Sequence, residues 1–341
     1  MCNTGSAAAL ALLTLAALTG SGVHRHGDRT PVEDTIAFST DADALEALSA
    51  AYGYGQLTDV GKRTGYRLGE YIRARYDALL SSQYNRSEMY IRSTDSTRTK
   101  MTVLTAMSAV FPPGADNWNP HLPWQPTPYT TVMPLRFNNI FLRYRTCGQP
   151  CSGSTSLSCH YDTITNTQSG YIVMLGVVVQ ISLGLPLNDA LAQLYPNIQA
   201  VAGAAIDVLF GNDDYVALQA GVLLNEFVTT ASAAASGNVT QRVRIYSAHD
   251  YNVYSFMAAS RVTPRHGVPN YGAAFSLELR RRVDSGAFVV LPVYLPAPGE
   301  APVYLQVDGC SALLCELDEF LSLTADYVLD ESSWRDHTLL R

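Results

Sequence analysis

The chain has 341 residues, of which 47% are hydrophobic and 16% are charged, and its net charge is −7. This composition is typical of a packed globular protein and excludes a disordered chain. The negative charge argues against a nucleic-acid partner, because nucleic acids are bound by basic surfaces. Lys62 and Lys100 are the only lysines, so arginine, the side chain suited to bidentate phosphate contacts, carries nearly all the positive charge.

The N-terminus has the pattern of a secretory signal peptide. An apolar run over residues 7–18 is followed by small residues, and we assign residues 1–20 to the signal, although no Lys or Arg precedes the run. The longest apolar run elsewhere, residues 173–185, is shorter than the roughly 18 residues that a membrane helix needs. The sequence therefore predicts export and a mature protein that does not enter a membrane.

Helical spacing of apolar residues predicts helices over residues 57–80, 96–110 and 218–231, and the Ala- and Leu-rich stretch before Asp213 is also helical in pattern. Prolines, tryptophans and small polar residues predict loops over residues 111–134 and 146–170. Strand patterns cover residues 88–91, 242–247, 273–279, 287–295 and 303–307.

Strands and helices alternate along the chain, which is typical of an α/β fold. We expect a Rossmann-like mixed sheet flanked by helices, formed by residues 21–133 and 214–341. Residues 134–213 would form a smaller inserted α-helical cap domain.

Two features of the sequence agree with export. Cys310 and Cys315 are close in sequence, flank a predicted turn and are placed to form a disulfide. Asn85 and Asn238 each begin an Asn-x-Ser/Thr acceptor site for N-linked glycosylation. Both asparagines would carry glycans in an exported protein.

With Cys2 set aside as part of the signal peptide, the remaining cysteines form an odd set of three, Cys147, Cys151 and Cys159. One disulfide and one free thiol is the simplest interpretation. A zinc site that also includes His160 is the alternative. Disulfides are favoured because the spacing fits no standard zinc pattern and because disulfides dominate exported chains.

Three short polar segments, residues 23–31, 90–95 and 246–250, each follow or end a predicted strand. In an open α/β sheet the loops after the strands converge on one crevice, which is the usual ligand site. The second and third segments also begin helices, whose N-termini attract anions. The residues expected to meet there are Arg25, His26, Arg29, Arg92, His249 and Asp250.

These residue types together indicate phosphate chemistry. Three gathered arginines repel one another unless an anion lies between them, and phosphate matches their geometry and charge. A histidine can attack phosphorus as a nucleophile, and a neighbouring carboxylic acid can protonate the departing oxygen. We expect no metal and no other cofactor, because the arginines would supply the positive charge that magnesium supplies in other enzymes.

The motif Arg-His-Gly-Asp-Arg-Thr-Pro at residues 25–31, with Ser-Ala-His-Asp at residues 247–250, resembles the histidine acid phosphatases of branch 2 of the histidine phosphatase superfamily. The seven-residue motif is specific, whereas Arg-His-Gly alone is not. The resemblance is weakest over residues 133–213. It extends to the family's prostatic and lysosomal members over residues 54–76, 89–126, 218–227 and 309–320.

The resemblance implies a secreted or lysosomal acid phosphatase that hydrolyses small phosphomonoesters through a phosphohistidine. His26 would be the nucleophile, Asp250 would protonate the leaving alcohol, and His249 would lie beside the phosphoryl group. Arg25, Arg29 and Arg92 would bind its oxygens. The pH optimum would be acidic because Asp250 must hold its proton. The state of assembly stays open, a homodimer included.

Other polar residues near these motifs are expected to have structural roles. Asp28 and Asp95 would orient arginines, and His24 would be a packed neighbour of the site. Residues 265–267 repeat Arg-His-Gly but lack the Arg and Pro that follow it in the motif. We expect this second copy to lie in a loop outside the site.

The sequence departs from the family pattern before Arg25, where only residues 22–24 are left for a strand if a peptidase cuts near Gly20. Either the apolar run is retained as the strand, or the N-terminus is a truncated or incorrectly joined version of a longer one, and we favour the second. This departure motivates one alternative function, a secreted ligand-binding protein with weak or no catalysis.

Two alternative enzymes of the same superfamily are less favoured. A phytase or inositol-phosphate phosphatase would need many cations around its pocket, and the chain has only two lysines. A phosphoglycerate mutase would have Glu, and not Asp250, after the distal histidine.

Overall fold

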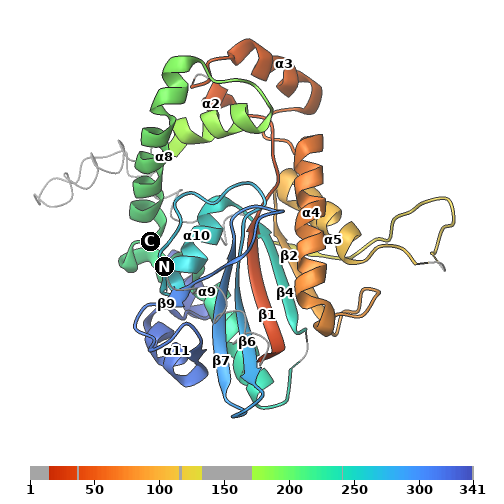
Figure 1. Ribbon diagram of the computed structural model, residues 1–341, viewed down its shortest axis with the longest axis vertical. Helices are drawn as coiled ribbons and strands as arrows, with labels where there is room; N and C mark the ends of the chain where they lie inside the picture. Colours follow the sequence, from red (N-terminus) through yellow and green to blue (C-terminus); the bar gives the residue numbers. More distant parts are fainter. Residues whose placement is uncertain (1–14, 37, 115–116, 133–170, 240, 340–341) are drawn as a thin grey trace, which may run out of the picture.

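The computed structural model describes residues 15–36, 38–114, 117–132, 171–239 and 241–339. Its centre is an eight-stranded mixed sheet in the order β10-β7-β6-β1-β4-β2-β3, with β8 paired to β7 (Figure 1). β1 (Leu15–Arg25), β4 (Val243–Ala248), β2 (Met89–Thr94) and β3 (Thr130–Val132) are parallel to one another. β6 (Ala274–Arg282) and β7 (Phe288–Leu295) run antiparallel to their neighbours. The predicted mixed α/β sheet is confirmed.

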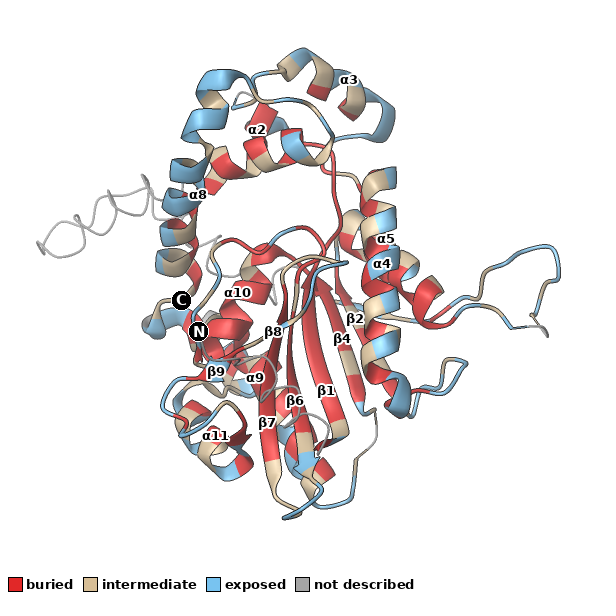
Figure 2. Ribbon diagram, viewed as in Figure 1, coloured by how far each residue is buried: buried red, intermediate tan, exposed pale blue. Residues whose placement is uncertain are grey.

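Helices cover both faces of this sheet because the side chains of its strands alternate. Ile245 joins one core cluster with α4 (Asp59–Tyr76) and α5 (Thr97–Val110). The next residue, Tyr246, joins the cluster on the other face with α9 (Asp213–Ala235) and α10 (Asp250–Ala259). The inner strands are accordingly buried along most of their length (Figure 2). A two-sided core fixes the strand ends that carry the polar loops.

A further group of helices lies beyond the carboxyl ends of the parallel strands, at the top of Figure 1. It consists of α2 (Glu33–Ile36), α3 (Ala42–Tyr52), a helix over residues 171–182, and α8 (Asp189–Phe210). Gln180 joins the group: its amide donates to Thr40, and its amide oxygen accepts from Ser39 at 2.7 Å. The domain boundaries at residues 134 and 213 stay a prediction. The group also includes α2 and α3, which come before residue 134 in the sequence.

Short elements complete the described chain. They are η1 (Asp77–Leu79), β5 (Val262–Thr263), β8 (Val303–Tyr304), β9 (Gln306–Val307), β10 (Cys315–Glu316), α11 (Leu317–Thr324), η2 (Ala325–Tyr327) and α12 (Glu331–Leu339). None of the helices in the described part of the chain combines the length and the apolar composition that crossing a bilayer requires.

The first strand is longer than the sequence led us to expect. β1 has 11 residues and pairs with β4 on one side and with β6 on the other. In this chain the end of the apolar run continues the strand before residues 22–24. Cleavage near Gly20, and with it the shortened strand, stays a prediction. Residues 15–20, which the sequence assigned to the signal peptide, form the first half of β1.

The predicted disulfide is present between Cys310 and Cys315, whose Cα atoms are 5.6 Å apart. Glu319 lies close to the two sulfurs, but sulfurs joined in a disulfide offer no thiolate to a metal. The other three cysteines and His160, the alternative zinc set, lie outside the described residues.

Glycines on α4 let this helix approach its neighbours closely. A Cβ at Gly69 would overlap the backbone carbonyl of Ala106 on α5, and one at Gly61 would overlap the carbonyl of Asp28. These glycines are eight residues apart, so they lie on one face of the helix. Contact with backbone atoms leaves no flexible side chain to move away. The loop after β1 and α5 are therefore both positioned by α4.

We expect Gly69→Ala to lower the free energy of unfolding by about 1–3 kcal/mol, because the added methyl overpacks the contact between α4 and α5. Gly203→Ala on α8 is the matched control, since its Cβ would meet its nearest neighbour at 3.7 Å. Relief of glycine's backbone entropy should make that change neutral or stabilising by up to about 1 kcal/mol. Urea unfolding of both variants measures the difference, and an equal effect would contradict this account of the packing.

Candidate active site

The loops after β1 and β4 meet at the carboxyl end of the sheet. In the parallel register Arg25 lies opposite Ala248, so both strands end at the same level. The backbone N–H of His26 then donates to the carbonyl of Ala248 at 3.0 Å. His249 is the N-cap of α10, and Asp250 is its first residue. Two of the three predicted segments are thereby joined backbone to backbone.

The buried rings of His26 and His249 lie edge to face, with their centroids 5.5 Å apart. His26 Nδ1 lies 2.8 Å from the carbonyl oxygen of Gly27. A carbonyl only accepts hydrogen bonds, so Nδ1 carries the proton of the neutral ring. The lone pair of His26 is therefore on Nε2, the nitrogen that is free to act as a nucleophile.

The tautomer of His249 is likewise fixed by its hydrogen-bond partners. Arg98 Nη2 donates to His249 Nδ1 at 3.4 Å, and a guanidinium has no acceptor, so Nδ1 must be the unprotonated nitrogen. His249 Nε2 then carries the hydrogen and donates to Thr94 Oγ1 at 3.2 Å. The Nε2–H of His249 is thus directed to the end of β2.

Burial is the main reason that the pKa values of both histidines lie well below their usual range, and the positive charge of Arg98 is the next cause. A lowered pKa means that each ring stays neutral as the pH falls below the usual histidine value. His26 therefore keeps its lone pair in acid solution.

Arg25 is fully buried and links the two loops. Its Nη2 forms an ion pair with Asp250 Oδ2 at 2.9 Å, and its Nη1 donates to the carbonyl of Pro269 at 2.7 Å. Its guanidinium also lies 4.1 Å from the centre of the Tyr271 ring. These contacts hold the guanidinium beside both His26 and the carboxyl group of Asp250.

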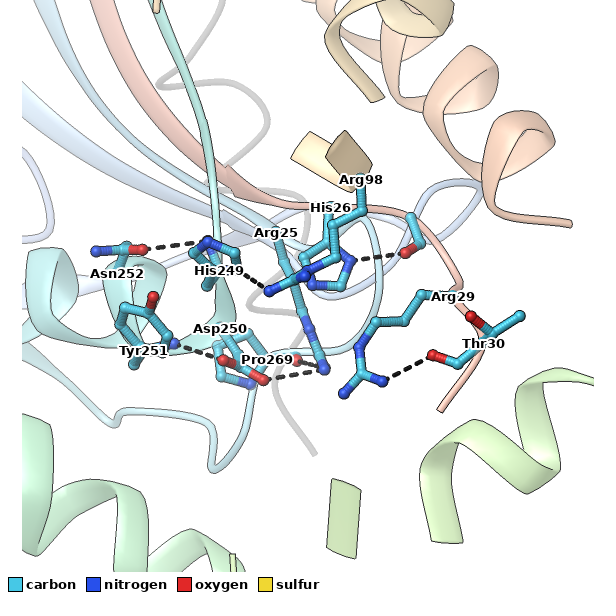
Figure 3. Close-up of polar contacts among 11 residues, drawn as sticks. Arg25, His26, Arg29, Thr30, Arg98, His249, Asp250, Tyr251, Asn252 and Pro269 are labelled. Carbon is cyan, nitrogen blue, oxygen red and sulfur yellow. Dashed lines mark hydrogen bonds and ion pairs between the residues drawn. The ribbon is translucent and has the colours of Figure 1, made fainter. Parts of the chain in front are cut away.

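Two further arginines face the same place without a counter-charge. Arg29 Nη1 donates to the backbone carbonyl of Thr30 at 2.9 Å, and Arg98 reaches His249 (Figure 3). No carboxylate of the described residues forms an ion pair with Arg29 or Arg98. Burial lowers the pKa of Arg98, and the charge of Arg29 lowers it further. This uncompensated positive charge around two neutral imidazoles favours an anion.

The structure does not bring Arg92 to this cluster. Its Nη2 pairs with Glu226 on α9 at 2.8 Å, and its guanidinium lies 4.7 Å from the centre of the Tyr246 ring. The reason is strand alternation, because Arg92 lies in register with Tyr246 and so faces α9. The third arginine of the cluster is Arg98, in the first turn of α5. That turn follows a strand and opens a helix, which is the signal that could have identified it.

Asp250 has contacts from three directions. Oδ1 accepts from the backbone N–H of Tyr251 at 2.9 Å, while Oδ2 pairs with Arg25. The buried hydroxyl of Tyr171, from the helix over residues 171–182, also hydrogen-bonds with Asp250. Burial, and after it the charge of Asp250, holds the pKa of Tyr171 well above its usual range, so this hydroxyl keeps its proton and donates.

Two of the expected structural roles of neighbouring residues are correct. His24 is buried, donates from Nδ1 to the carbonyl of Arg25 at 3.2 Å, and has a pKa lowered to about 4 by burial. The second Arg-His-Gly is in a loop, where Arg265 pairs with Asp207 and His266 stacks on Tyr294.

The two acidic residues do not pair with arginines as we expected. Asp28 accepts from the hydroxyl of Thr64 at 2.5 Å, which ties its loop to α4. Asp95 pairs with Lys100, one turn further along α5.

A cleft of about 290 Å³ lies next to the cluster. Asp28 and Tyr271 line it at the end of the sheet, and the ring of Tyr271 is 5.6 Å from that of His26. Val178 and Ile181 form part of its wall on the side of the helical group. The cleft therefore offers room for the part of a ligand that extends beyond an anion bound by the arginines.

Comparison with known proteins identifies the family of the chain. The family model for the histidine phosphatase superfamily (branch 2) matches residues 21–152. Prostatic acid phosphatase from Bos taurus is 30% identical over 339 residues, which cover 91% of this chain and 85% of that protein. Lysosomal acid phosphatase from Xenopus laevis is 30% identical over 334 residues, or 88% of this chain and 74% of that protein.

Solved structures share the fold at low identity. The phytase from Citrobacter braakii has a TM-score of 0.62 at 13% identity and covers 92% of this chain and 98% of its own. Multiple inositol polyphosphate phosphatase from Bifidobacterium longum, solved with phosphate, has a TM-score of 0.58 at 12% identity, with 97% of each chain covered.

We expect Arg98→Gln to weaken the binding of inorganic phosphate by roughly 10- to 100-fold, the effect of losing a charge-assisted contact. Arg92→Gln is the matched control, because Arg92 faces α9 and pairs with Glu226. Its phosphate affinity should stay within about twofold of the wild type, while its fold loses stability. Isothermal titration calorimetry measures both, and the opposite ranking would show that Arg92 is the anion ligand.

Proposed function

The chain belongs to branch 2 of the histidine phosphatase superfamily, and we propose that it is an acid phosphatase that hydrolyses phosphate monoesters through a phosphohistidine at His26. One observation carries the proposal. The unprotonated Nε2 of His26 lies among Arg25, Arg29 and Arg98, and the last two form no ion pair among the described residues. A nucleophile surrounded by cations is suited to a phosphoryl group.

In the first step the three guanidiniums would bind the phosphoryl oxygens, and His26 Nε2 would attack phosphorus opposite the leaving oxygen. A nitrogen–phosphorus bond forms as the ester oxygen–phosphorus bond breaks. The protonated carboxyl group of Asp250 gives its proton to the leaving oxygen, so the product is a neutral alcohol. The hydrogen bond from His26 Nδ1 to Gly27 stabilises the positive charge that the ring acquires.

The carboxyl group of Asp250 is held in place by its ion pair with Arg25. A bound phosphoryl group would share that guanidinium, so the carboxyl group would lie beside it.

In the second step water would attack the phosphohistidine, and Asp250, now a carboxylate, would accept the proton of that water. The nitrogen–phosphorus bond breaks, inorganic phosphate leaves, and His26 returns to its neutral form. The lowered pKa of His26 supports the first step in acid, because a protonated ring could not attack phosphorus.

Two observations favour a simple monoester over phytate. The acid phosphatases are similar in sequence over most of the chain, whereas the phytase structures share only the fold. Arg67 is the only cation among the described residues that line the cleft, whereas a polyphosphorylated ligand would need several. The ligand-binding alternative is based on a first strand that is too short. It is less favoured because β1 is a full strand paired on both sides in this structure.

We also propose that the protein is secreted or lysosomal and is a glycoprotein. The relatives are named prostatic and lysosomal acid phosphatases, and the Cys310–Cys315 disulfide suits an oxidising compartment. Asn85 and Asn238 are both exposed, as glycan acceptors must be. Its partners are small phosphomonoesters and not nucleic acids, and the mature form enters no membrane. A homodimer stays open.

We expect His26→Ala to hydrolyse 4-nitrophenyl phosphate in acid at least roughly 10³-fold more slowly than the wild type, because the nucleophile is gone. EDTA should leave the wild-type rate unchanged. His266→Ala, in the second Arg-His-Gly, is the matched control and should keep full activity. Wild-type activity in the His26 variant would end the proposal.

Asp250→Asn should reduce the turnover of an alkyl phosphate by about 10²–10⁴-fold, the usual contribution of a positioned acid. The loss with 4-nitrophenyl phosphate should be much smaller, because its leaving oxygen departs without a proton. Asp207→Asn, at a carboxylate paired with Arg265 outside the cluster, controls for lost ion pairing. Steady-state kcat is the measurement. The same factor for both substrates would mean that Asp250 only maintains the structure.

A further inference from the structure

The cleft beside the arginine cluster has walls of different chemistry. α4 contributes Thr64 and Arg67 to one side. The helix over residues 171–182 contributes Val178 and Ile181 to another, and Ile181 is 41% exposed although it is apolar. The polar wall and the apolar wall face the same space. Such a cleft suits a ligand that is itself partly apolar and partly charged.

The position of Arg67 relative to the cluster follows from α4. Thr64 holds Asp28, two residues after His26, through a hydrogen bond of 2.5 Å. Arg67 is three residues further along α4, or about one turn of roughly 5.4 Å. Its guanidinium therefore belongs to the same cleft at a greater distance from the phosphate position.

Arg67 is available for a ligand. No acidic side chain in the described part of the chain forms an ion pair with it, and Glu70, three residues along α4, is exposed and forms none with it either. The other polar residues of the cleft wall that the structure describes are uncharged, apart from Asp28. Arg67 is therefore the one cation of this described lining that can pair with an anionic group of a ligand.

We propose that the cleft binds the alcohol part of the substrate, that this alcohol is aromatic and carries one carboxylate, and that Arg67 binds this carboxylate. The inference rests on the proposed function, because it places the phosphate among Arg25, Arg29 and Arg98. The aromatic body lies between Tyr271 and the apolar wall. Arg67 acts on substrate choice and takes no part in the chemical step.

The test compares two substrates of equal size, carboxymethylphenyl phosphate and carbamoylmethylphenyl phosphate, in both the meta and para series. The two leaving groups have the same shape and differ in charge. The wild type should prefer the carboxylate by about 1.5- to 5-fold in kcat/KM, the range expected for a solvent-accessible ion pair. The preference should appear in KM, and it should shrink as salt is added.

Arg67→Gln should abolish this preference and Arg67→Glu should reverse it, while both keep the wild-type kcat/KM for the amide. Arg63→Gln is the matched control, because Arg63 is equally exposed on α4 but does not line the cleft. A carboxylate preference that is absent from the wild type, or that survives in Arg67→Gln, overturns the inference and leaves the proposed function standing. Failure to hydrolyse either substrate also overturns the inference, and failure to hydrolyse 4-nitrophenyl phosphate as well removes the proposed function.

Discussion

The parallel pairing of β1 with β4 is the constraint on which the site depends. Because Arg25 lies opposite Ala248, the residues that follow each strand leave the sheet at the same level. His26 then bonds to the backbone of β4, and Arg25 reaches Asp250 at the start of α10. A shift by one residue would turn each side chain to the other face of the sheet. The register of these two strands thus suffices to place the proposed nucleophile and the proposed acid side by side.

The charges of the site are balanced only in part by the protein. Asp250 compensates Arg25, but Arg29 and Arg98 have no carboxylate among the described residues. The helix and loop that hold them are fixed by contacts that do not involve charge, such as the close approach of Gly61 to the loop of Asp28. Packing energy therefore offsets the cost of gathered cations. Burial, and after it the charge of these cations, keeps the pKa of both histidines low, so the rings stay neutral.

The sequence predicts the parts of this site that follow from local pattern. Residues 25–29 and 247–250 end strands, and their side chains meet as expected. Arg92 could not be placed as easily, because the side of the sheet that a strand residue faces depends on which helices pack there. The length of β1 could not be predicted either, because its apolar residues fit the pattern of a signal peptide as well as that of a central strand. The contribution of α2 and α3 to the helical group depends on contacts such as that between Gln180 and Thr40, which no local pattern encodes.

The helix over residues 171–182 connects parts of the molecule that the proposed mechanism treats separately. Its first described residue, Tyr171, donates to Asp250, while Val178 and Ile181 line the cleft. Gln180, one residue before Ile181, fixes the same helix to the segment after α2. The apolar wall that the cleft offers a substrate and the donor that orients Asp250 therefore lie on the same helix, so the position of this helix sets both.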